Sequence, residues 1–134
     1  MITHAGARTR ALYAWEQDDL EKRLTERLTV KQMQQYANEF WCYENWDSRE
    51  RTPTLHYTRE AVAYCWGRSD IFMTRRQAHR VVLIHELVHA RGYGGIGSNA
   101  HTVGFVRTYL TLLNKHVGFD RDELFETAFL KGLI

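Results

Sequence analysis

The chain has 134 residues and a formal net charge of +2, from 18 Lys and Arg against 16 Asp and Glu. This length fits one domain, 1–134, and the 44% of apolar residues excludes a disordered chain. The small charge argues against a nucleic-acid partner, because nucleic-acid-binding domains usually carry a clear basic excess.

The first part of the chain predicts two helices and a loop. Residues 8–28 favour helix and carry leucines at i, i+4 spacing. A second helix is expected from Thr29, as N-cap, to about Trp46. The charged segment 47–54, which contains the proline, is expected to form a loop. The face of the second helix expected to be buried consists of Val30, Met33, Ala37, Phe40 and Trp41.

Three short segments rich in aromatic and β-branched residues follow, at 55–58, 61–66 and 70–74. Gly67 to Ser69 predicts a tight turn between the last two segments. Segment 61–66 is apolar at every position, which indicates a strand covered on both faces. We therefore expect a small antiparallel sheet of about three strands.

The remaining residues predict three helices. The first runs from Arg75 to about Arg91, and Val81 to Ile84 is apolar on all sides, which is typical of a helix in the middle of a domain. Glycines within 92–97 end this helix and reverse the chain. Further helices are expected at about 99–117 and 120–131, the latter capped by Asp120. Helices, a sheet and then helices predict the α+β class.

The predicted central helix carries the sequence His85-Glu86-Leu87-Val88-His89. Histidines four residues apart lie on one face of a helix, so both imidazoles can bind a single tetrahedral zinc ion. Glu86 is then placed to act as general base on a zinc-activated water and to return the proton to the leaving amine. Two surface histidines beside an exposed glutamate are the plainer interpretation, but it leaves the apolar surroundings unexplained.

A catalytic zinc ion needs a third protein ligand and leaves its fourth position to water. His101 is the best candidate, because the glycine-rich reversal can bring the start of the next helix close to the motif. Glu123 and Glu126 are the competing candidates. The other four histidines are expected to be structural or solvated residues: His4 in the terminal segment, an outward His56, a solvated His79, and His116 at a helix end.

Compartment and redox state follow from two absences in the sequence. No apolar core of a secretory signal is visible in residues 1–10, and no aliphatic run is long enough to span a membrane. We expect a cytoplasmic protein without a membrane partner. Cys42 and Cys65 form no CxxC pair, so a zinc ribbon is excluded and two buried thiols are expected.

The motif and its downstream histidine resemble a known group of enzymes. His85 to Ala90 followed by His101-Thr102-Val103-Gly104-Phe105 is similar to the SprT-like group of zincin metallopeptidases, although Thr102 stands where that group has glycine. Residues 13–16 and 105–110 also resemble stretches of a small family of bacterial and phage proteins described as metallohydrolases. The resemblance implies a compact zincin-like domain that acts on a protein or peptide substrate.

Zincins border the active-site cleft with a strand that pairs with an extended substrate, so the resemblance implies this role for 61–66 or 70–74. Tyr64, Trp66 and Tyr93 are candidates for shaping the substrate pockets, although aromatic residues of this kind more often belong simply to the core. The chain lacks the zinc-ribbon cysteines and the extended DNA-binding tail of some SprT-like proteins, which argues against DNA-linked proteolysis.

Two other functions fit the same residues. A metal hydrolase acting on a small amide or another non-peptide substrate would use the same chemistry in a narrow closed pocket. A non-catalytic, zinc-stabilised binding module would close the metal with a fourth protein ligand and leave no water to activate.

Overall fold

The structure is a computed structural model that describes residues 4–24, 26–92 and 101–134. Within these ranges five α-helices and a three-stranded sheet confirm the α+β class. None of the helices in these ranges is long and apolar enough to cross a membrane. The elements are α1 (His4–Trp15), α2 (Val30–Tyr43), β1 (Thr54–Tyr57), β2 (Tyr64–Trp66), β3 (Asp70–Met73), α3 (Arg80–Arg91), α4 (Val103–Val117) and α5 (Arg121–Leu130).

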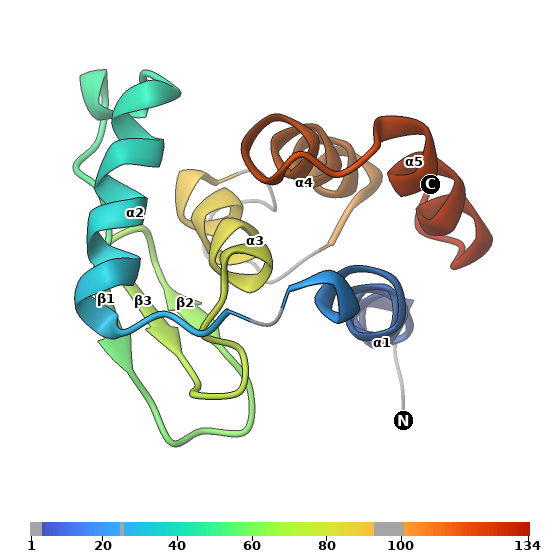
Figure 1. Ribbon diagram of the computed structural model, residues 1–134, viewed down its shortest axis with the longest axis horizontal. Helices are drawn as coiled ribbons and strands as arrows, with labels where there is room; N and C mark the ends of the chain where they lie inside the picture. The colour runs from blue at the N-terminus through green and yellow to red at the C-terminus, as the bar shows by residue number, and fades with distance from the viewer. Residues whose placement is uncertain (1–3, 25, 93–100) are drawn as a thin grey trace.

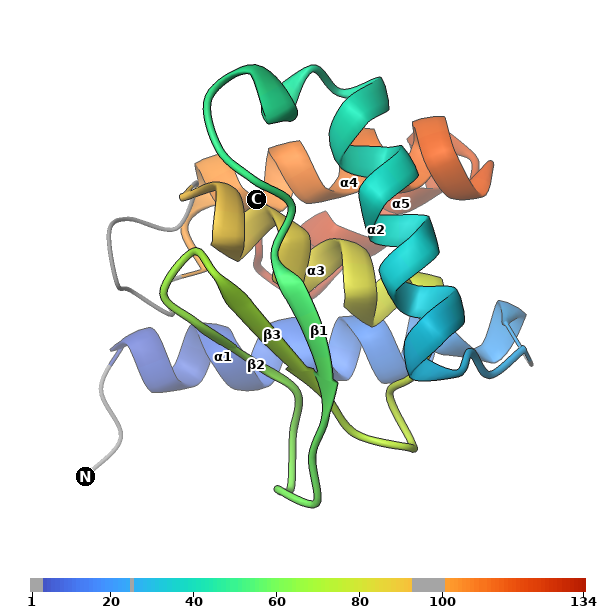
Figure 2. The ribbon, with the colours of Figure 1, turned by 90° about the vertical axis from the view of Figure 1, so that its left-hand side faces the viewer.

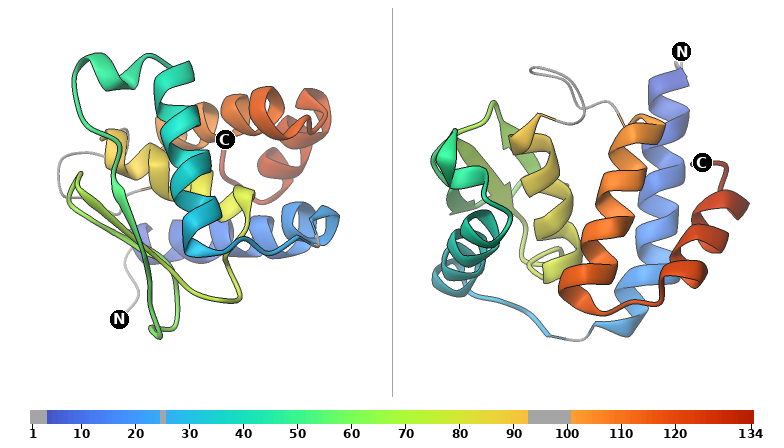
Figure 3. Two further views of the ribbon diagram at one scale, coloured as in Figure 1. Left: turned by 60° about the vertical axis from the view of Figure 1, so that its left-hand side comes forward. Right: turned by 90° about the horizontal axis from the view of Figure 1, so that it is seen from above.

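Helix α3 lies in the middle of the fold. The sheet and α2 lie on one side of it, and α1, α4 and α5 lie on the other (Figures 1 and 3). Every residue from 81 to 90 is buried, because the helix meets packed neighbours in all directions. The apolar run at 81–84 therefore predicted the position of this helix correctly.

The first helix is shorter than the sequence predicts. After α1 the chain passes through a wider π-helical turn, Glu16–Leu20, and then a tighter 3₁₀ turn, Glu21–Arg23. It becomes extended at Leu24. The predicted helix over 8–28 is therefore wrong beyond residue 23. The physical reason is a tertiary bond, since the N–H of Leu28 donates to the carbonyl of Ala78 at 2.7 Å and not to its own helix.

Helix α2 begins where the sequence predicts. The hydroxyl of Thr29 accepts from the N–H of Gln32, whose side chain accepts from the N–H of Thr29, and this capping box fixes the first turn. The predicted buried face is confirmed except at Val30, which is only partly buried in that first turn. The expected burial of both thiols is wrong for Cys42, which is exposed on α2, while Cys65 is half-buried and also free.

The sheet is mixed, not antiparallel as expected, and its strand order is β1-β3-β2. Strand β1 pairs in parallel with β3, and β2 pairs antiparallel with β3. Strand β2 does not lie next to β1, because a space one strand wide separates them. After the turn at Gly67, strand β3 fills this space and pairs with both. Figure 2 shows the three strands in front of α3. Strand β2 is therefore an edge strand, and the prediction of two covered faces is wrong, since Val62 and Trp66 are exposed.

Helices α3, α4 and α5 begin at capped positions. Helix α3 starts later than the predicted Arg75, because His79 takes the N-cap position and faces Val82 N. Thr102 caps α4 and Asp120 caps α5, the latter as predicted. Gly92 ends α3 with a φ of 98°, a left-handed conformation that favours glycine.

Two glycine substitutions test this description of the α3 and α4 ends. Gly92→Ala should lower the free energy of unfolding by about 1–2 kcal/mol or more, because alanine is strained at positive φ and its Cβ would lie 2.9 Å from the Arg68 guanidinium. Gly104→Ala should raise it by about 0.5–1 kcal/mol, because alanine favours a helix and its Cβ would make only an ordinary van der Waals contact, 3.7 Å from the Thr102 hydroxyl. Chemical denaturation measures the free energy of unfolding of both variants. Equal shifts of the same sign would contradict the left-handed conformation assigned to Gly92.

Candidate metal centre

Three histidines from two elements converge beside the middle of the fold. His85 and His89 come from α3, and His101 directly precedes Thr102, the N-cap of α4; all three are buried. The Nε2 atom of His101 lies 3.1 Å from Nε2 of His85 and 3.0 Å from Nε2 of His89. Two nitrogen ligands of a tetrahedral zinc ion lie roughly 3.3 Å apart. The three side chains are therefore close enough to bind one metal ion.

His101 is held from two sides by α1. The guanidinium of Arg8 donates to the carbonyl of His101 at 2.7 Å and to the carbonyl of Leu133 at 2.9 Å. The hydroxyl of Thr9 lies 3.2 Å from Nδ1 of the same histidine. These contacts turn the Nε2 atom toward the α3 pair.

The competing carboxylates do not join this cluster. Glu123 and Glu126 lie on an exposed face of α5, and Glu123 forms an ion pair with Arg23. Of the candidates named from the sequence, the structure therefore brings His101 to the motif and leaves both glutamates outside.

Glu86 lies beside the three histidines and faces the same cavity. Its Oε2 atom is 3.8 Å from Nε2 of His85, and the side chain is buried. Burial raises the pKa of Glu86 to about 7, with His85 opposing the rise and Glu16 adding to it. A carboxylate with a pKa near neutrality is matched to proton transfer at neutral pH.

Glu16 is a buried acid that the sequence analysis did not single out as part of the site. It lies in the π-helical turn after α1, and its Oε2 atom accepts from Nδ1 of His85 at 2.7 Å and from the hydroxyl of Tyr109 at 2.6 Å. Nothing in the run Glu16-Gln-Asp-Asp distinguishes this acid from its surface neighbours, because its partner is 69 residues away. Only the resemblance over 13–16 pointed to this stretch.

The charges of the centre fit a divalent cation. Burial and neighbouring charge lower the pKa of His89 to about 2 and that of His101 to about 3, so both are neutral and can bind a metal. Burial opposes protonation of His85, but Glu16 and Glu86 outweigh it and raise its pKa to about 9. Two buried carboxylates, Glu16 and Glu86, lie next to His85, and a bound cation that takes the place of its proton keeps them compensated.

The three histidines and Glu86 line a cavity of about 300 Å³. Thr9 and Tyr13 of α1 line one side, and Val62, Ala63 and Tyr64 line the side next to β2. Of the three aromatic candidates for the pockets, Tyr64 lines the cavity, Trp66 does not belong to its lining and is 70% exposed, and Tyr93 lies outside the described residues.

His79 corrects a sequence prediction. It is buried, not solvated, and its Nε2 atom lies 3.1 Å from Glu21. The reason is its position as N-cap of α3, which turns the ring toward the 3₁₀ turn before α2. The side chain of His4 lies outside the described part of the chain. The two remaining histidines outside the centre form pairs with carboxylates: His56 with Asp70 and His116 with Glu44.

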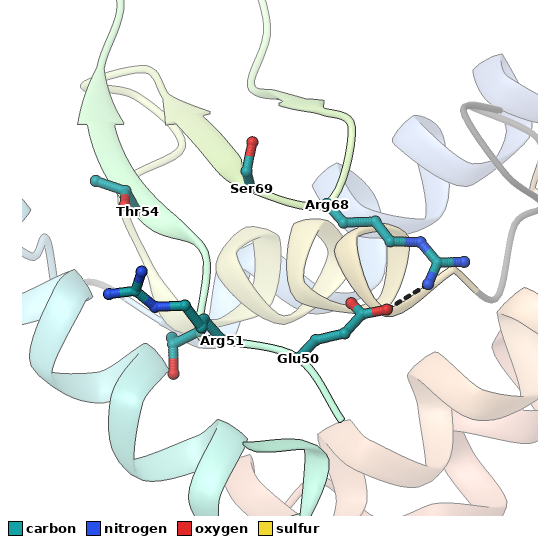
Figure 4. Close-up of a pocket in the computed structure, with 6 residues that line it drawn as sticks. Glu50, Arg51, Thr54, Arg68 and Ser69 are labelled. Atoms are coloured by element: carbon teal, nitrogen blue, oxygen red, sulfur yellow. Dashed lines mark hydrogen bonds and ion pairs between the residues drawn. The ribbon is translucent and has the colours of Figure 1, made fainter. Parts of the chain in front are cut away.

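A second cavity, of about 460 Å³, lies where β1 begins and β2 turns into β3. Figure 4 shows Arg51 and Arg68 pointing away from each other and Glu50 paired with Arg68. Its lining contains no histidine or cysteine, so it does not offer a metal-binding set. The lining residues are Glu50, Arg51, Thr52, Thr54, Arg68 and Ser69.

Comparisons with protein-family models, with curated proteins and with solved structures find no match to this chain.

Metal analysis of the purified chain tests the centre. We expect one equivalent of zinc per chain, and we expect His101→Ala to lose most of it because two histidines alone hold zinc weakly. His116→Ala is the matched control, since it removes a histidine at the other end of α4 and should leave the zinc content unchanged. Undiminished zinc in His101→Ala would remove this residue from the ligand set.

Proposed function

We propose that this chain is a zinc-dependent metallopeptidase, in which His85, His89 and His101 hold one Zn²⁺ and Glu86 is the general base. One observation carries the proposal: three Nε2 atoms face one another beside a buried carboxylate, and these side chains line one cavity. The expected partner is a protein or peptide substrate, and amide hydrolysis is the expected reaction.

The number of ligands favours catalysis over a structural metal site. Among the described residues, the three histidines are the one group of three or more His, Cys, Asp or Glu close enough to share an ion. The segment 93–100, which joins α3 to α4, contains none of these residue types. Three protein ligands leave a coordination position for water or substrate, whereas structural zinc sites are closed by four.

The roles of the residues follow from their positions. A zinc ion supplies Lewis acidity and lowers the pKa of water toward neutrality. Glu86 lines the cavity next to His85. It would accept a proton from the attacking water and deliver it to the amine of the leaving group. Tyr13 lines the same cavity, and burial together with Glu86 and Glu16 raises its pKa to about 12, so that its hydroxyl stays protonated.

The sheet supports an extended peptide as substrate. Strand β3 is paired on both sides, so it has no edge for a substrate, which leaves β2 of the two strands suggested by the sequence. The other edge of β2 is unpaired within the described residues, and Ala63 and Tyr64 at its start line the cavity. A peptide that adds to this edge as a further strand would lie next to residues that line the cavity.

Glu86→Gln tests the role of the general base. We expect it to keep zinc and to lower the rate of hydrolysis by about 10²–10⁴-fold, because the proton acceptor is removed while the histidines remain. The assay is mass spectrometry of cleavage products from a library of unstructured peptides, run beside a panel of small amides.

Glu126→Gln is the control, because it changes an exposed acid on α5. A fully active Glu86→Gln enzyme would contradict the proposed mechanism. Cleavage of the small amides without cleavage of any peptide would show a different substrate class, and zinc binding without hydrolysis of either would favour a binding module.

A further inference from the structure

One face of the first helix is directed at the histidine cluster. Thr9, Tyr13 and Glu16 follow one another at i, i+4 and i+7, the spacing of a helical stripe. Thr9 contacts Nδ1 of His101, Tyr13 stacks 6.3 Å from the ring of His85, and Glu16 contacts Nδ1 of His85. The segment from α1 through the π-helical turn thus forms an outer layer around the centre.

Glu16 makes the most closely defined of these contacts. Its carboxylate is almost completely buried, and a carboxylate only accepts hydrogen bonds, so Nδ1 of His85 must carry the proton. A neutral imidazole protonated on Nδ1 has its lone pair on Nε2, which is the atom that faces the other two histidines. Metal binding requires loss of the proton on Nε2 of His85, and the contact with Glu16 keeps the other proton on Nδ1, so Nε2 is the atom that can bind a metal.

Tyr109 fixes the carboxylate in turn. Its hydroxyl lies 2.6 Å from Oε2 of Glu16 and 3.0 Å from the carbonyl of Val81, so it links the acid to the first turn of α3. Tyr109 is fully buried on α4. Three elements, the π-helical turn, α3 and α4, therefore meet at one carboxylate oxygen.

A buried carboxylate is costly unless it is fully compensated, which is why its retention in a core calls for an explanation. Two comparisons within the chain show that such a contact is not a general feature of buried histidines. Nδ1 of His89 is buried and has no hydrogen-bond partner among the described residues. His79 does pair with an acid, but Glu21 is 18% exposed and lies at the longer distance of 3.1 Å.

We propose that Glu16 is a positioning residue of the metal centre, which orients His85 and increases the affinity for the metal while Tyr109 holds the carboxylate in place. This inference rests on the metal site of the proposed function but not on hydrolysis. Carboxylates that accept a hydrogen bond from a ligating histidine fix the ring orientation and raise its basicity as a ligand.

Zinc affinity, measured by competition with a chromophoric chelator, tests the proposal. Glu16→Gln keeps the size of the side chain and an oxygen that can accept from Nδ1, but it removes the charge; we expect zinc affinity to fall by about 10–100-fold. Tyr109→Phe should lower it by a smaller factor, because the carboxylate remains but loses one hydrogen bond. Glu21→Gln is the matched control and should leave the affinity unchanged.

Thermal unfolding with and without zinc separates positioning from simple destabilisation. A purely structural role lowers the midpoints of the zinc-free and the zinc-loaded protein equally. A positioning role reduces the rise in stability that zinc produces, by about 1.4 kcal/mol for each tenfold loss of affinity. This second measurement keeps the test valid if Glu16→Gln is less stable than the wild type.

The outcomes distinguish this inference from the proposed function. If Glu16→Gln binds zinc as tightly as the wild type, or if Glu21→Gln loses zinc affinity equally, the proposed role of Glu16 is overturned. The proposal of hydrolysis then still stands. A wild-type chain that binds no zinc overturns both proposals. Reduced affinity in Glu16→Gln supports the role of Glu16 even if the wild type cleaves no peptide.

Discussion

The burial of charge beside a helix that is otherwise apolar is the constraint on which the rest of the structure depends. Glu16 and Glu86 are both withdrawn from water next to His85, and charge in a core must be balanced and hydrogen-bonded. The chain meets this requirement with the tyrosine on α4 and with histidines that can share a divalent cation. Core packing and metal chemistry are therefore two aspects of the same arrangement.

The same constraint explains why a chain of 134 residues uses so many layers around α3. A helix buried on every side needs the sheet and α2 against one face and the α1–α4 layer against the other. Helix α1 is itself held from outside, since the indole of Trp15 donates to the hydroxyl of Thr127 on α5 at 2.8 Å. Helix α5 thus supports the centre without supplying a residue to it.

Local sequence patterns correctly predicted those structural features that interactions between neighbouring residues determine. The apolar run at 81–84 located α3, and Thr29 and Asp120 marked helix starts through their capping bonds. Features that depend on contacts between distant residues were predicted wrongly. The backbone hydrogen bond from Leu28 to Ala78 ends the first helical segment early, and the position of β3 between β1 and β2 makes the sheet mixed.

The centre divides in the same way. The spacing of His85 and His89 is a property of one helix and is visible in the sequence. His101 could be predicted as the third histidine because a short glycine-rich segment separates it from that helix. The acid that holds His85 is not visible, because a glutamate in a charged stretch gives no sign that it turns inward to a partner far along the chain.

The Arg8 guanidinium has a consequence for the order in which the protein matures. It joins the carbonyl of His101 to that of Leu133, across sequence separations of 93 and 125 residues. During translation Arg8 leaves the ribosome early and cannot make the second of these bonds until Leu133 has emerged. The arrangement around His101 is therefore completed only after Leu133 has been synthesised, so a nascent chain carries the motif before it carries the finished centre.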